Sequence, residues 1–371
     1  MRAPLHRYAV LAALALAPAP ARAHVKWFAD FTFSDRPLSA TEVATPIFIA
    51  LAVFSAVVIG ALVVLDARLA TAPWYRRIVL SLERYRDKSG LVLRVATGAV
   101  MLLNWQADAM LVPELPAEAA WLGWFQFGVA IALLSHRTVP LAGLGLLALY
   151  VIGIARFGMF HMLDYAYYVG FGLYFLVSVL PAGRARSLGL PALYATVGFS
   201  LCWVALEKLV YPQWSLYVLS QNPALALGFP IDLFLVIAAF VELSLGYLLI
   251  IGLLERPFAL IITLVFFTTT LVFGKLEVIG HTMLHAALIV FLIEGTAGRY
   301  PPPVRLHRQS RVRVAFASVN FLLLLGLLLA PYASGARHMY EAAREGELAP
   351  AQTDRTPTSL TAPGRSGDPA P

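Results

Sequence analysis

The sequence predicts an all-α polytopic membrane protein of about ten transmembrane helices, arranged as two tandem parallel four-helix bundles plus flanking helices. Composition predicts the class: apolar residues make up 60% of the 371 residues and charged residues only 13%. Soluble proteins have about 45–50% apolar and about 25% charged residues. The second observation is a series of apolar segments separated by short polar loops, as expected of a chain that crosses a bilayer repeatedly.

The chain begins with a pattern typical of a secretory signal peptide. Basic side chains precede a short apolar run over 8–17, and an A-x-A cleavage pattern ends at Ala23. We expect residues 1–23 to be removed, which makes His24 the first residue of the mature chain. The segment 24–43 would then lie in the periplasm of a bacterial cell.

Ten apolar segments follow, and a helix needs about 20 such residues to cross the hydrocarbon core. The predicted spans lie near 44–66, 91–112, 119–136, 138–156, 161–181, 190–210, 230–252, 257–275, 281–297 and 314–331. The first span and a basic loop occupy 44–90, and a second basic loop with the last span occupies 298–331. The tail 332–371 is rich in Pro, Ala, Thr, Gly and charge, so we expect it to be disordered and periplasmic.

The positive charges predict the orientation of these spans. The loops 67–90 and 298–313 hold six and five Lys and Arg residues, whereas the stretch 211–230 on the other side holds none. By the positive-inside rule the two basic loops are cytoplasmic, so both mature termini are periplasmic and the membrane is the bacterial inner membrane. This placement also accounts for the net charge of +7 without nucleic-acid binding.

Residues 91–181 and 190–297 repeat a pattern, each over four predicted spans. Each unit has a glycine ten residues before a charged residue: Gly98 with Asp108, and Gly198 with Lys208. An even number of spans per unit gives both units the same orientation, so a duplication would produce two parallel bundles.

Ionisable side chains gather in the second unit, and a charged residue inside a span indicates a functional site. The candidate site consists of Glu207, Lys208, Glu242, His281 and His285. Glu242 lies deepest in its span, and the two histidines, four residues apart, share one helix face. We expect these side chains to converge in one pocket that opens toward the periplasm. The alternative is structural: an interfacial lysine and a hydrogen-bonded histidine pair.

The first unit holds a weaker copy of this set. Gln126 stands roughly at the position of Glu242, and His161 stands at the position of His281. Asp164 lies near the position of His285, so the first unit lacks both the acid and the second histidine.

Several short motifs in the second unit carry a family resemblance. They are Gly198, Glu207-Lys208-Leu209 before Tyr211-Pro212, Glu242 followed by Gly246 and Gly252, Arg256-Pro257, and Gly280-His281. With these motifs residues 190–297 resemble the DoxX-like family of small four-helix membrane proteins, and residues 91–181 resemble it more faintly. The resemblance implies a membrane component of quinone-linked redox systems, which include thiosulfate:quinone oxidoreductase.

Three functions remain open at this stage. In a quinone-linked oxidoreductase subunit, His281, His285 and Lys208 would donate hydrogen bonds and Glu242 would relay protons. The sequence has no dinucleotide-binding glycine motif, CxxCH motif or cysteine cluster. Redox equivalents would therefore come from quinone, histidine-ligated haem, or a periplasmic or membrane redox partner. The second function is a transporter or a scaffold for an unknown partner. The third is copper handling through the α-amine and imidazole of His24.

Overall fold

The computed structural model describes residues 26, 31–181, 183–295, 307 and 309–346, and every regular element in that part of the chain is helical. The main helices are α4 (Pro46–Thr71), α6 (Ser89–Gln106), α7 (Ala120–Ala132), α8 (Val139–Phe157), α10 (Tyr167–Ser178), α12 (Gly189–Val210), α14 (Ile231–Ile251), α15 (Glu255–Phe273), α16 (Lys275–Glu294) and α17 (Ser310–Arg344). Short helices connect them: α3 (Ala40–Val43), α5 (Pro73–Glu83), η1 (Arg86–Lys88), α9 (Met159–Met162), η2 (Leu163–Tyr165), α11 (Arg184–Ser187), α13 (Pro212–Gln221) and η3 (Pro223–Ala226).

Six helical stretches in the described part are long and apolar enough to cross a membrane. They are Pro46–Thr71, Val139–Phe157, Arg184–Val210, Ile231–Ile251, Glu277–Glu294 and Ser310–Arg344. Each coincides with a predicted span, and α7 and α10 are shorter apolar helices within two others. The predicted class, an all-helical protein with membrane-spanning helices, therefore agrees with the fold.

The C-terminal region corrects one prediction. We expected disorder from residue 332 onward, but α17 continues through Pro331 as far as Arg344. Its last turns are held by packing, because Tyr332 and Ala336 are fully buried and the Tyr332 ring contacts Phe160 at 4.9 Å. The predicted signal peptide and the remainder of the tail lie outside the described residues.

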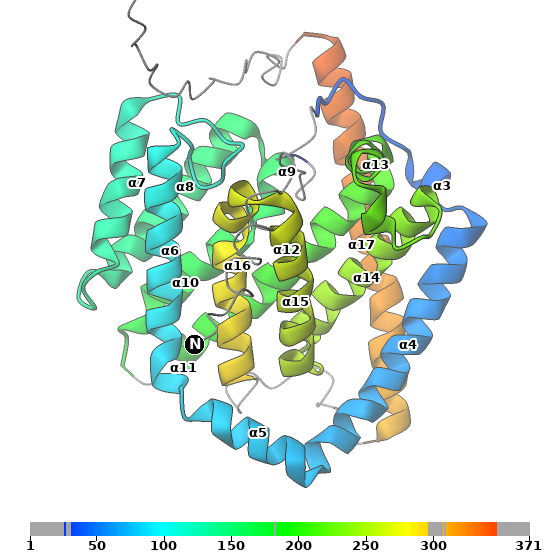
Figure 1. Cartoon of the computed structure of the whole chain (residues 1–371), viewed down its shortest axis with the longest axis horizontal. Coiled ribbons are helices and arrows are strands. Elements are labelled where there is room, and N and C mark those ends of the chain that lie inside the picture. The colour runs from blue at the N-terminus through cyan, green and yellow to red at the C-terminus, as the bar shows by residue number, and fades with distance from the viewer. Residues whose placement is uncertain (1–25, 27–30, 182, 296–306, 308, 347–371) are drawn as a thin grey trace, which may run out of the picture.

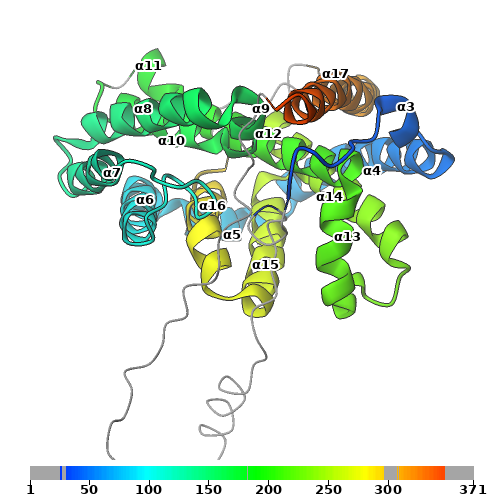
Figure 2. The same ribbon diagram turned by 90° about the horizontal axis from the view of Figure 1, so that it is seen from above.

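Most of the main helices pack on the helix that follows them in the chain. Two pairs join helices that are far apart in the chain, α16 with α6 and α4 with α17. Helix α6 packs on α7, α7 on α8, and α8 on α10, and the second unit pairs α12 with α14 and α15 with α16. Across the units, α10 packs on α12 and α16 packs on α6, while α4 and α17 form a pair beside α14 and α12 (Figures 1 and 2). The first and last helices of each unit therefore form the contact between the units.

Figure 1 shows which elements lie at each end of the helical body. In Figure 1 the upper end carries α3, α9, α13 and the end of α17, and the lower end carries α5 and α11. Arginines of α5 and α11 lie at the lower end, as the charge pattern of the loops predicts for a cytoplasmic side. Asp164 follows α9 and Glu207 lies in the last turn of α12, so the ion cluster described below lies at the upper end.

Glycine lets α12 and α14 approach until their backbones touch. A Cβ atom on Gly198 would lie 2.5 Å from the carbonyl oxygen of Gly246, and a Cβ atom on Gly246 would lie 2.5 Å from that of Gly198. No side chain fits at either position without separating the helices. Small residues that allow such close contact are typical of helix packing in membranes.

We expect Gly198→Val to lower the free energy of unfolding by about 1–3 kcal/mol, because the added side chain overpacks a backbone contact. Equilibrium unfolding of the purified protein in mixed micelles measures this. Gly326→Val is the control, since a Cβ atom on Gly326 in α17 meets nothing within 4 Å. Equal effects at the two positions would contradict the assignment.

Candidate functional site

One lysine side chain joins carboxylates from two distant parts of the fold. The Lys26 Nζ atom lies 2.5 Å from Asp164 Oδ2 and 2.7 Å from Glu207 Oε2. Asp164 belongs to η2, after α9, and Glu207 lies in the last turn of α12. All three side chains are at most 1% exposed. We call Lys26, Asp164 and Glu207 the ion cluster. It connects the N-terminal part of the chain to both helical units.

Aromatic rings complete the surroundings of the ammonium group. The Nζ atom lies 5.8 Å from the ring centroid of Phe31 and 5.9 Å from that of Trp214, within the range of cation–π attraction. The Trp214 ring stacks on Tyr211 at 4.0 Å, and its Nε1–H donates a hydrogen bond to Asp35 at 2.7 Å. The rings are thus positioned by contacts of their own.

The electrostatics of the ion cluster favour the charged form of Lys26. Burial opposes the charge on Lys26, but the carboxylates of Asp164, Glu207 and Glu114 outweigh burial and raise the lysine pKa. His161 Nε2 lies 2.6 Å from Glu114 Oε1 at the edge of this group. Three carboxylates thus face one lysine and one histidine.

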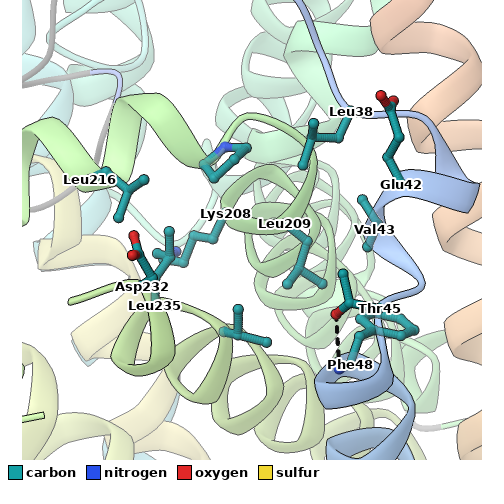
Figure 3. Close-up of a pocket in the computed structure, with 12 residues that line it drawn as sticks. Leu38, Glu42, Val43, Thr45, Phe48, Lys208, Leu209, Leu216, Asp232 and Leu235 are labelled. Atoms are coloured by element: carbon teal, nitrogen blue, oxygen red, sulfur yellow. Dashed lines mark hydrogen bonds between the residues drawn. The ribbon is translucent and has the colours of Figure 1, made fainter. Parts of the chain in front are cut away.

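The neighbouring residue Lys208 belongs to a different ion pair. Its Nζ atom lies 2.7 Å from Glu242 Oε2, and the two side chains are 18% and 22% exposed. Lys208 also lines a cavity of about 250 Å³ between α3, α4, α12, α13 and α14, where Figure 3 shows it with Asp232 on one side and Glu42 on the other. Most of the remaining lining is apolar.

The two predicted histidines lie on one face of α16, as their spacing predicts. The His281 ring stacks on Phe266 at 4.5 Å and the His285 ring meets the same phenylalanine edge-on at 5.8 Å. His281 Nδ1 lies 2.9 Å from Glu277 Oε1, and the Glu277 carboxylate is fully buried. Glu277, His281 and His285 therefore follow one another at intervals of one helical turn.

His285 lines a groove between α6 and α16. The groove has a volume of about 530 Å³ and is almost entirely apolar. Its lining includes Leu91, Val95 and Ala99 of α6 with Thr282, His285 and Ile289 of α16. The Thr282 hydroxyl donates back to the carbonyl of Val278. Among the residues that line the groove, His285 is the one with a titratable side chain.

The chain matches no protein-family model, no curated protein and no solved structure.

The five predicted site residues thus fall into three sets of contacts. Glu207 joins Lys26 and Asp164, Lys208 joins Glu242, and the two histidines pack on Phe266. Adjacent residues of a helix point about 100° apart, which is why Glu207 and Lys208 have different partners.

In the first unit, Gln126 has a structural role. Its side chain is fully buried, accepts a hydrogen bond from the Leu111 N–H at 2.8 Å and donates to the carbonyls of Met101 and Ala109 at 3.1 Å. Asp164, another residue of the weaker copy, has a partner that sequence reasoning missed, namely Lys26. Nothing local marks that lysine, because 138 positions separate it from Asp164.

Metal donors do not cluster in the described part of the chain, where no group of three His, Cys, Asp or Glu residues could hold an ion. The predicted copper ligand His24 lies outside the described residues, so that prediction stays untested.

We expect Lys26→Met to lower the free energy of unfolding by about 3–5 kcal/mol, because it leaves two buried carboxylates without their cation. Lys88→Met is the matched control: Lys88 Nζ lies 2.7 Å from Asp87, but those side chains are 59% and 63% exposed, so little change is expected. Unfolding in mixed micelles measures both. Similar decreases in the free energy of unfolding for the two variants would show that burial of the Lys26 ion pairs does not contribute to stability.

Proposed function

We propose that this protein is a multi-pass inner-membrane component that binds a quinone in the groove between α6 and α16 and exchanges protons with it through His285. The observation that carries the proposal is an imidazole in the wall of an apolar groove of about 530 Å³. A quinone needs an apolar slot for its ring and tail and a hydrogen-bond donor for a carbonyl oxygen. The groove supplies the slot and His285 supplies the donor.

A proton path is the second requirement, because reduction of a quinone to a quinol takes up two electrons and two protons. His285, His281 and Glu277 lie on one face of α16, and eight residues of helix span about 12 Å. The 2.9 Å contact of His281 with Glu277 provides a second titratable pair behind the groove histidine. We therefore assign the proton-relay role to Glu277 rather than to Glu242, whose partner is Lys208.

In this proposal the chain binds the quinone and supplies its protons. A periplasmic or membrane redox partner would supply the electrons. The quinone groove is not lined by the other predicted site residues Lys208, Glu242 and Glu207, which therefore have no direct part in quinone binding. The resemblance of residues 190–297 to DoxX-like membrane proteins belongs to the same proposal.

The arrangement of spans is also part of the proposal: ten crossings, with two parallel four-helix bundles between the flanking helices α4 and α17. The contacts between the units support it. A twofold axis along the membrane normal would exchange the α10–α12 contact with the α16–α6 contact, and both contacts are present. The same axis would place the quinone groove at one of the two related interfaces.

Photolabelling tests the binding site directly. A short-chain azidoquinone should label peptides of α6 and α16 in the purified protein, and an excess of unlabelled quinone should suppress the labelling. Val95→Trp should reduce labelling about tenfold or more, because the indole fills the groove beside His285. Val95 is 63% exposed, so the substitution adds no overpacking of the core.

The control is Val319→Trp, which places the same indole on α17, where Val319 is 53% exposed. It should leave labelling unchanged. His285→Leu should also weaken binding, by about tenfold for one lost hydrogen bond to the carbonyl. Labelling of the cavity at Lys208 instead, or none at either place, would contradict the proposal, and substrate flux in proteoliposomes without quinone binding would favour a transporter.

A further inference from the structure

We propose that Asp164, Glu207, Phe31 and Trp214 form a binding site for a primary alkylammonium group, which the side chain of Lys26 occupies as a tethered ligand. The site is distinct from the quinone groove and does not depend on it. We call these four residues the ammonium cage.

The chemistry of the ammonium cage is specific for a small cation with N–H donors. Two carboxylate oxygens lie 2.5 and 2.7 Å from the Lys26 Nζ atom, and two aromatic rings lie within 6 Å of it. Carboxylates satisfy N–H donors, and ring faces attract positive charge on the remaining sides. Acids and rings around one nitrogen therefore select an alkylammonium over an anion or a neutral amine.

The ammonium cage also holds more acceptor capacity than Lys26 uses. Asp164 Oδ1 and Glu207 Oε1 are buried and have no hydrogen-bond partner in the described part of the chain, and both side chains are at most 1% exposed. Buried polar atoms are nearly always satisfied, so such atoms need an explanation. A cation-binding site explains these unpaired oxygens, because its carboxylates are arranged around an ammonium group that the chain itself supplies.

Lys26 is a tethered ligand because the same chain carries it and the acids, 138 positions away in the case of Asp164. Each acid comes from a different unit: Asp164 from η2 and Glu207 from α12. A tethered ligand acts at a high effective concentration and needs little intrinsic affinity. Truncation of the lysine should therefore leave a site that a free amine can occupy at millimolar concentration.

Chemical rescue tests this inference. Lys26→Ala removes the Cγ, Cδ, Cε and Nζ atoms, which together correspond to n-propylammonium, a cation at neutral pH. In maltoside micelles, Lys26→Ala should lower Tm by about 5 °C or more. Added n-propylammonium should restore at least about half of that loss with a saturable dependence on concentration, and it should not stabilise the parent protein.

Two controls separate the ammonium cage from general effects. Propan-1-ol, the neutral analogue, should not rescue Lys26→Ala. n-Propylammonium should not rescue Lys208→Ala, because the partner of Lys208 is a carboxylate that is 22% exposed. Rescue by the alcohol, equal rescue of Lys208→Ala, or no rescue of a folded Lys26→Ala protein would each overturn the inference.

A second set of variants covers the case in which Lys26→Ala does not fold. Lys26→Met fills the space but leaves both carboxylates without a cation. Adding Asp164→Asn and Glu207→Gln to Lys26→Met should raise Tm above that of Lys26→Met alone, while the two amide substitutions in the parent should lower it. The opposite sign in either comparison would show that the acids do not require an ammonium partner.

Discussion

The structure depends on one constraint, that charge removed from water must be neutralised where it lies. Lys26, Asp164 and Glu207 meet this constraint together, and none of the three could be buried alone without a large desolvation cost. Their pairing fixes the N-terminal part of the chain, the η2 turn and the end of α12 in one arrangement. Aromatic rings pack beside this contact: the Trp214 ring lies 5.9 Å from the Lys26 Nζ atom and stacks on Tyr211.

The polar side chains discussed above differ in how far they are exposed to solvent. The side chains of Lys26, Asp164 and Glu207 are closed to solvent. The Lys208–Glu242 pair is part-exposed, with Lys208 on the wall of a cavity, and His285 lines an apolar groove. A closed group is suited to holding the fold together, whereas an imidazole at an open apolar groove can meet a ligand that arrives from the bilayer. The proposed quinone site and the ammonium cage therefore follow from different degrees of enclosure.

Local sequence patterns predicted the structural features that depend only on residues close together in the chain. Helices occupy the predicted spans because runs of apolar residues favour helix in a membrane whatever lies elsewhere in the chain. The shared face of His281 and His285 follows from their spacing alone, and both rings contact Phe266.

Long-range pairing could not be predicted in this way. No periodicity links Lys26 to Asp164. Helix geometry directs the adjacent side chains of Glu207 and Lys208 apart, but the sequence does not show which partners they find. The helical end of α17 could not be predicted either, because the composition of the tail 332–371 suggests disorder. The buried contact of Tyr332 with Phe160 shows why the helix continues.

The contact between Gly198 and Gly246 leaves no space for a side chain between α12 and α14 at this crossing. Because each glycine lies against the carbonyl of the other, a larger residue at either position has to push the two helices apart. Both helices also line the cavity at Lys208. The width of that cavity therefore depends on two glycines that do not themselves line it.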